Sequence, residues 1–239
     1  MSKKNDKKTI ELYFWPTPNG QKISIALEEL ELPYTIHPVN ITRGDQFKPD
    51  YLAISPNNKM PVIVDPDGPG GEPVSIFESG AILQYLARKA GRLRGKDKRA
   101  RILVDEWLFW QVSGFGPMAG QAHHFRHYAP EKIQYGIDRY TNEMKRLYGV
   151  LDKQLEGRDY IADKFSIADI AVYPFAKIAG QQGQDLETFP NVKAWIERMG
   201  ARPSVMRGMA VGADLTAQQI DLSKDADAQR ILFGNKAKP

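Results

Sequence analysis

The chain has 239 residues, no cysteine and a net charge of +4, from 33 basic and 29 acidic residues. This length suits one large domain or two modest ones, and the absence of cysteine excludes disulfides, thiolate metal sites and a cysteine nucleophile. The sequence has no cluster of basic residues interleaved with aromatic residues, which is the pattern that would indicate a nucleic-acid surface. No apolar run is long enough to span a bilayer, and the polar start lacks a signal peptide's apolar region. We therefore expect a cytoplasmic protein that binds neither nucleic acid nor membrane, and any thiol chemistry needs a thiol from the ligand.

Strand and helix patterns alternate in the first part of the chain. An alternating aromatic strand at 11–15 is broken by P16-T-P-N-G20, after which apolar residues at three-to-four spacing mark a helix that reaches Leu30. The further expected elements are a strand at 34–40, a short helix before Ile54, strands at 62–64 and 74–77 joined by a Gly/Pro-rich turn, and a helix at 78–90. The predicted order is βαβαββα.

Beyond a charged, glycine-containing segment the pattern is helical only. Helices are expected at 101–112, from Pro130 to about 155, at 167–175 and at 191–200, with Gly114, Gly116 and Pro117 interrupting the first and Ser166 and Asp169 forming a capping box for the third. We divide the chain into a solvated tail at 1–8, an α/β domain at 9–90, a linker at 91–98, an all-α helical bundle at 99–203 and a C-terminal extension at 204–239. Ile231, Leu232 and Phe233 are a candidate docking patch in that extension.

Two short motifs in the α/β part indicate a binding site for a small zwitterionic peptide. Met60 before Pro61 offers backbone polar groups at the start of a strand, and Glu78-Ser79 lies where a strand gives way to a helix. A donor-rich helix N-terminus close to an exposed backbone edge suits a ligand that has its own peptide bonds and carboxylates.

The combination of motifs resembles the glutathione transferases, and most closely their bacterial nu class, which is similar to the glutathione-binding part of the yeast prion-forming nitrogen regulator. The motifs that carry the resemblance are P16-T-P-N-G-Q-K-I23, S55-P-N-N-K-M-P61, F77-E-S-G-A-I-L83, L108-F-W-Q-V112 with G116-P-M118, H123-H-F125 and S166-I-A-D-I-A171. The resemblance implies a thioredoxin-like N-terminal domain, a helical domain that completes the site, and a homodimer. Members of the nu class reduce disulfides with glutathione and without a catalytic cysteine of their own.

The resemblance also assigns binding roles. Ser79 and the helix N–H groups would hold the γ-glutamyl carboxylate, and Glu78 would meet the ammonium group; the alternative is a plain N-cap pair. A cis bond before Pro61 would turn the Met60 backbone toward the cysteinyl segment. Lys59 and Gln46 are candidates for the glycyl end.

The ligand sulfur needs a group that stabilises it as thiolate. Thr17 and Asn19 are donors at the strand-to-helix junction, with a helix N-terminus behind them, and the motif favours them over a simple turn. Tyr13 is the rival, because other glutathione transferase classes use a tyrosine near the end of the first strand. Arg139 would reach a carboxylate of glutathione, although pairing with Glu143 explains it equally well.

Two further groups of residues carry weaker signals. His123 and His127 share a helical face, but no third ligand is evident, so a zinc site is disfavoured and we expect no metal. An apolar pocket for a second substrate would use one or two of several aromatic and sulfur-containing residues, most of which we expect in the core. These residues are Phe109, Trp110, Phe115, Met118 and Phe125.

The expected function is therefore glutathione-dependent disulfide reduction, in which both reacting sulfurs belong to ligands. The partners would be glutathione or glutathione disulfide, a small disulfide substrate and a second copy of the chain. One alternative is a conjugating transferase or peroxidase that acts on electrophiles with Tyr13 as thiol activator. The other is a non-catalytic glutathione-binding regulatory module on the same fold.

Overall fold

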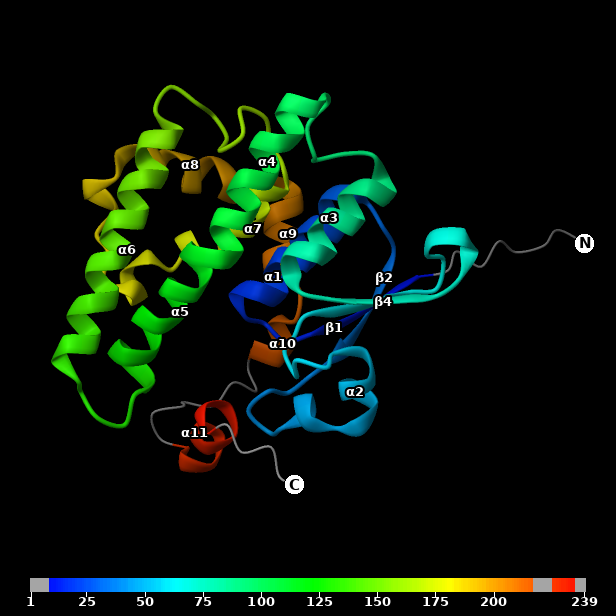
Figure 1. The fold of residues 1–239 in the computed structure, drawn as a ribbon, viewed down its shortest axis with the longest axis horizontal. Coiled ribbons are helices and arrows are strands. Elements are labelled where there is room, and N and C mark those ends of the chain that lie inside the picture. The colour runs from blue at the N-terminus through cyan, green and yellow to red at the C-terminus, as the bar shows by residue number, and fades with distance from the viewer. Residues whose placement is uncertain (1–8, 217–224, 235–239) are drawn as a thin grey trace, which may run out of the picture.

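The computed structural model describes residues 9–216 and 225–234, so the tail expected at 1–8 lies outside the described residues. An α/β half and a helical half lie side by side (Figure 1). The α/β half consists of β1 (Ile10–Phe14), α1 (Pro18–Leu30), β2 (Tyr34–Pro38), α2 (Pro49–Ile54), β3 (Val62–Asp65), β4 (Val74–Phe77) and α3 (Ser79–Ala90). The helical half consists of α4 (Lys98–Trp110), α5 (Gly116–His123), α6 (Gln134–Leu155), α7 (Ile167–Ala176), α8 (Pro190–Gly200), α9 (Pro203–Ala210), α10 (Ala213–Thr216) and α11 (Ala226–Phe233).

The four strands form one mixed sheet in the order β2-β1-β3-β4, in which only β1 and β2 are parallel. Side chains alternate between the two faces of a strand, so Leu12 and Phe14 pack with α1 and α3, whereas Tyr13 faces Tyr51 of α2. Figure 1 shows α2 on the opposite side of the sheet from α1 and α3. The predicted βαβαββα order and the thioredoxin-like fold with an all-helical second half are confirmed.

The interruption predicted after residue 112 takes a different form. The chain stays helical from Lys98 to Tyr128 and widens into π-helical segments at 111–115 and 124–128. Pro117 falls in the first turn of α5, just past the first widened segment, so its missing N–H and its ring are accommodated without a break. The glycines and the proline therefore change the helical register instead of ending the helix.

Helix α1 lies at the centre of the molecule and contacts α3, α7 and α9. Helix α9 starts at Pro203 and crosses the division expected at residue 203. Gly208 permits its close approach, because a Cβ there would lie 2.4 Å from the Ile25 Cα atom of α1. Ser24 of α1 reinforces the contact by donating to the Gly208 carbonyl at 2.7 Å. The two halves therefore share one hydrophobic core.

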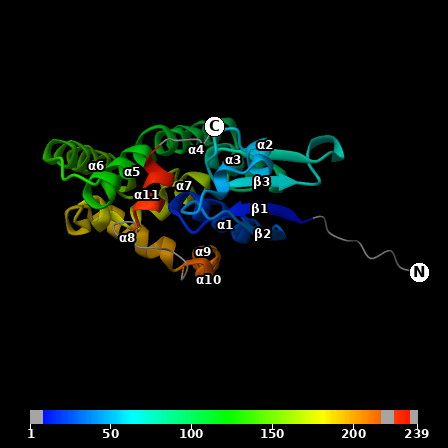
Figure 2. The same cartoon turned by 90° about the horizontal axis from the view of Figure 1, so that it is seen from below.

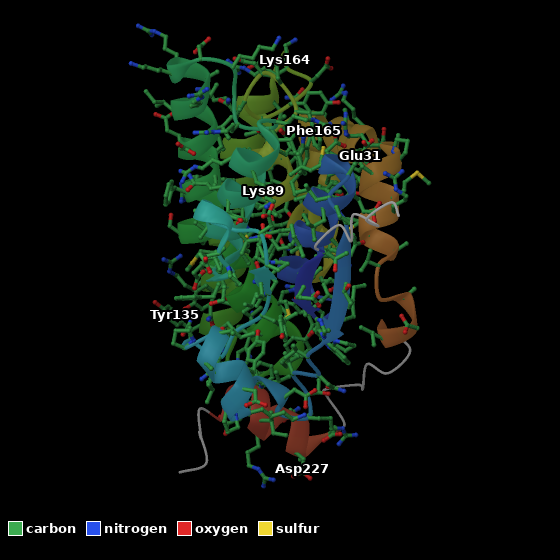
Figure 3. The ribbon with its side chains drawn as sticks, turned by 90° about the vertical axis from the view of Figure 1, so that its right-hand side faces the viewer. Glu31, Lys89, Tyr135, Lys164, Phe165 and Asp227 are labelled. Carbon is green, nitrogen blue, oxygen red and sulfur yellow. The ribbon has the colours of Figure 1, made fainter. Side chains whose placement is uncertain are left out.

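Helix α11 contains the apolar patch expected at residues 231–233. The Phe233 ring packs on His124 and Tyr128, with ring centroids 4.7 and 5.6 Å away. Asp227 of the same helix lies at the lower end of the molecule in Figure 3, and Figure 2 shows α11 against the helical half. Within the described residues no helix combines the length and apolar character needed to cross a bilayer.

Candidate functional site

A cavity of about 260 Å³ opens where the N-termini of α1 and α3 approach the start of β3. All of its lining residues belong to the α/β half. They are Asn19, Asn57, Lys59, Met60, Pro61, Phe77, Glu78 and Ser79. The cavity thus brings together five of the residues that the sequence suggested for binding or catalysis, namely Asn19, Lys59, Met60, Glu78 and Ser79.

The turn before α1 presents Asn19 to this cavity. Thr17 has extended backbone angles and caps the helix, its Oγ1 accepting from the Gly20 N–H at 3.4 Å and donating to the Met60 sulfur at 3.5 Å. Gly20 is required here because a Cβ would lie 2.3 Å from the Trp15 carbonyl oxygen. Asn19 is exposed and lines the cavity, whereas Thr17 does not. Thr17 therefore shapes the turn, and Asn19 supplies the amide.

Hydrogen bonds to its backbone hold the segment before β3 in place. The Tyr51 hydroxyl and the buried Ser55 hydroxyl both donate to the Lys59 carbonyl at 2.8 Å. The Met60–Pro61 bond is cis, as the resemblance implied. Met60 precedes the residues of β3 that pair with β1 and β4, so its backbone lies at the end of the ladder and at the wall of the cavity.

Glu78 and Ser79 form the first turn of α3. Ser79 is 9% exposed and lies at the helix N-terminus, where free backbone N–H groups favour an anion. Glu78 is exposed and occupies the N-cap position with φ 70°, in the region that favours glycine. Such a conformation costs of order 1–3 kcal/mol and persists where the surroundings impose it.

The strained backbone at Glu78 predicts that a glycine variant is more stable than an alanine variant. Glu78→Gly should have a free energy of unfolding about 1 kcal/mol higher than Glu78→Ala, because only glycine adopts a φ of 70° without cost. Both variants lack the carboxylate, so the comparison isolates the backbone. Urea unfolding measures it, and equal midpoints for the two variants would show that the backbone is unstrained.

Sequence reasoning missed Lys22, which lies beneath this site. Its side chain is buried, with 2% exposed, and its Nζ donates to Gln111 Oε1 at 2.7 Å and to Ser79 Oγ at 3.2 Å. Burial lowers the pKa of Lys22 to about 7, while the Glu78 carboxylate opposes this shift. A signal was present, since Lys22 precedes Ala26 by four residues and so belongs to the helix's inner face.

Two of the suggested binding residues lie outside the cavity lining. Gln46 is buried, and its Nε2 donates to the Ile41 carbonyl at 3.0 Å while its Oε1 has no partner among the described residues. Arg139 is exposed on α6 and pairs with Glu143 at 3.9 Å. Tyr135 in the preceding turn projects from the edge of the molecule in Figure 3. Neither Gln46 nor Arg139 lines the cavity, and the i,i+4 pairing matches the alternative interpretation of Arg139.

Tyr13 is also absent from the cavity lining. Its ring stacks on His37 at 4.9 Å and meets the edge of Tyr51 at 6.0 Å, on the face of the sheet covered by α2. Because Tyr13 directly precedes Phe14 in β1, its side chain lies on the opposite face of the sheet from Phe14, whose ring contacts the start of α1. This packing favours the interpretation of Tyr13 as a strand tyrosine over that of a thiol activator.

None of the residues considered for an apolar substrate pocket lines the cavity. Phe115 is fully buried between Trp110 and Tyr148, Phe109 is 58% exposed, and Phe125 stacks on Tyr140. These side chains therefore lie in different environments.

The histidine pair lies in the π-helical region of the helical half. The rings of His123 and His127 are 4.8 Å apart, and burial together with the His127 charge lowers the pKa of His123 to about 4. The described part of the chain contains no group of three or more potential metal ligands. The pair instead packs with Tyr128 and bonds the Gln181 carbonyl.

The fold and the cavity together define a class of protein in which a thioredoxin-like half carries a peptide-sized, donor-rich site and a helical half packs behind it. Family models for the glutathione S-transferase N-terminal domain and C-terminal domain match residues 17–89 and 116–203. The disulfide-bond oxidoreductase YfcG of Escherichia coli is 52% identical over 197 residues, which is 82% of this chain and 92% of that protein. The chain belongs to the glutathione S-transferase family.

Solved structures agree with this assignment. A glutathione transferase from Pseudomonas putida with one glutathione disulfide bound per subunit is 42% identical, with a TM-score of 0.83 over 87% of this chain and 94% of that one. A family member from Pseudomonas fluorescens with two glutathione bound is 44% identical, with a TM-score of 0.81 over 87% and 95%. Both relatives match nearly the whole chain.

Proposed function

We propose that the cavity binds glutathione and that the protein is a cytoplasmic glutathione-dependent disulfide-bond oxidoreductase. The observation that carries this proposal is the meeting of Asn19, the Met60 backbone and the Glu78-Ser79 turn around one cavity of about 260 Å³. The similarity to the disulfide-bond oxidoreductase YfcG and the glutathione or glutathione disulfide bound in related structures support it.

In this proposal the α3 N-terminus recognises the amino-acid end of the γ-glutamyl group. The Ser79 hydroxyl and the free N–H groups of the first turn donate to its carboxylate, where a helix dipole adds about 0.3–1 kcal/mol. The Glu78 carboxylate accepts from its ammonium group, which is a charge-assisted contact. A carboxylate and an ammonium on one carbon thus meet complementary charges on adjacent residues.

The rest of the ligand follows the edge of β3. The Met60 backbone pairs with the cysteinyl segment as an added strand would. Lys59 lines the cavity and is exposed, so its ammonium is available to the glycyl carboxylate. Gln46 and Arg139 do not line the cavity, so this binding mode assigns them no contact with the ligand.

The chemistry uses sulfur atoms of the ligands only, since the chain has no cysteine. The Asn19 amide donates to the glutathione sulfur and stabilises the thiolate. The thiolate attacks one sulfur of the substrate disulfide, which forms a mixed disulfide and releases the other sulfur as a thiolate that takes up a proton. A second glutathione thiolate attacks the mixed disulfide, yielding glutathione disulfide and the second substrate thiol. Two glutathione molecules are oxidised for each disulfide reduced.

Turnover of 2-hydroxyethyl disulfide tests this function directly. With saturating glutathione we expect a rate well above the uncatalysed exchange, measured by coupling glutathione disulfide to glutathione reductase and NADPH. A chloronitrobenzene electrophile is the matched comparison and should be a much poorer substrate. A disulfide rate at background, with glutathione binding demonstrated by calorimetry, would remove the reductase proposal and leave a conjugating or regulatory role.

We also propose that two copies of the chain associate through α4. Ile102 and Phe109 are seven residues apart, so they share one face of this helix, and they are 59% and 58% exposed. Phe77 of β4 is a further exposed aromatic residue. We take these exposed large apolar side chains as the proposed interaction surface. Sedimentation equilibrium should give twice the chain mass of 27.0 kDa, and Ile102→Glu combined with Phe109→Glu should give the monomer mass.

A further inference from the structure

The buried lysine beneath the α3 N-terminus has no role in the function proposed above. Lys22 has three N–H donors and no acceptor as an ammonium. Two donors go to Ser79 Oγ and Gln111 Oε1, and the ammonium lies 5.1 Å from the centroid of the Phe175 ring. The elements packed around it therefore contribute a hydroxyl, an amide and an aromatic face. Among the described residues, the acidic group whose charge acts on Lys22 is Glu78.

The charge state of Lys22 sets the direction of the Ser79 hydroxyl. An ammonium at 3.2 Å donates to a lone pair of the Ser79 oxygen, so the hydroxyl proton is free to point into the cavity. A neutral amine has a lone pair of its own and can accept that proton instead. Ser79 is thus free to donate toward the cavity when Lys22 is charged, whereas a neutral Lys22 competes with the ligand for its hydroxyl proton.

We propose that Lys22 is a positioning residue for the anionic ligand: its ammonium orients the Ser79 hydroxyl toward the ligand carboxylate, and ligand binding is accompanied by proton uptake at Lys22. The inference rests on the proposed glutathione site. It places the positive charge of Lys22 behind Ser79, in addition to the helix N-terminus, which already favours an anion.

The sign of the coupling follows from the charges. In the free protein the pKa of Lys22 is about 7, because burial disfavours the ammonium. A carboxylate bound at Ser79 favours the ammonium and raises this pKa, so a fraction of a proton is taken up when the ligand binds near neutral pH. Ligand affinity is therefore greatest below the free pKa and falls as pH rises above it, by up to about tenfold per pH unit.

S-methylglutathione is the probe, because it has both carboxylates and the ammonium but no thiol proton. Calorimetric titrations at about pH 7.5 in phosphate and in Tris, which differ in ionisation enthalpy, give the number of protons exchanged. We expect the wild type to take up roughly 0.5–1 proton per site. Lys22→Met should abolish this uptake and flatten the pH dependence of the dissociation constant. Lys177→Met, which removes an exposed lysine, should leave both unchanged.

A second variant separates the titration of Lys22 from its packing. Gln111→Glu keeps the lysine and places a carboxylate on the atom that now accepts from it at 2.7 Å, which should hold Lys22 charged in the free protein and abolish the uptake. Binding of the probe to the wild type without proton uptake would overturn this inference and leave the glutathione site intact. Absence of any binding would overturn both.

Discussion

Replacing Asn19 with alanine is expected to lower kcat/KM for 2-hydroxyethyl disulfide roughly 10²-fold, comparable with the loss of one preorganised donor at a developing anion. Asn19 lines the cavity and in the proposed function donates its amide to the glutathione sulfur, while the N-cap bond of α1 belongs to Thr17. The helix should therefore stay folded in the variant. Glutathione affinity should change little, because the proposed binding mode assigns the γ-glutamyl and cysteinyl contacts to other residues.

The matched control for this prediction is Tyr13→Phe. Tyr13 packs on His37 and Tyr51 and does not line the cavity, so the loss of its hydroxyl should leave kcat/KM within about twofold. Steady-state kinetics on the two variants decides between the two candidate thiol-stabilising residues. A large loss in Tyr13→Phe with little effect in Asn19→Ala would instead support the tyrosine-dependent conjugating transferase.

Replacing Asp169 with alanine should lower the free energy of unfolding by about 3–5 kcal/mol, since four buried donor groups, contributed by three residues, lose their acceptor. The fully buried carboxylate accepts from the Ile161 N–H at 2.9 Å and from the Trp195 indole at 3.0 Å. It also accepts from the Ser166 N–H at 3.0 Å and hydroxyl at 3.2 Å, which completes the capping box of α7.

Urea unfolding followed by circular dichroism measures this loss, with Asp159→Ala as the control. Asp159 pairs with Arg198 at 3.2 Å on the surface and is 72% exposed, so its replacement should cost under about 1 kcal/mol. Similar losses in the two variants would contradict a special role of the buried carboxylate.

Local sequence patterns predicted the features that depend on neighbouring residues. The strand and helix order follows from hydrophobic periodicity, and the capping box from a serine three positions before an aspartate. Asn19, Met60, Glu78 and Ser79 were predicted because each belongs to a short contiguous motif next to the start or end of a strand or helix. The structure assembles these motifs around one cavity.

Features that depend on distant residues were not predictable in the same way. Lys22 meets Gln111 across 89 positions of sequence, and no local pattern announces such a partner. The side chain of Gln46 turns toward its own loop, which its polarity alone does not indicate. The helical run through residues 111–128 absorbs a proline by changing its register, so residues that usually break a helix do not end this one.

The central place of α1 has a consequence for the order of assembly during synthesis. The helix that carries Asn19 leaves the ribosome early, whereas α9, which covers it through Gly208 and Ile25, follows after most of the helical half has been made. Domains generally fold as units from the N-terminus onward. In that order of emergence, the face of α1 that α9 covers in the finished fold stays uncovered until residues 203–210 have been made.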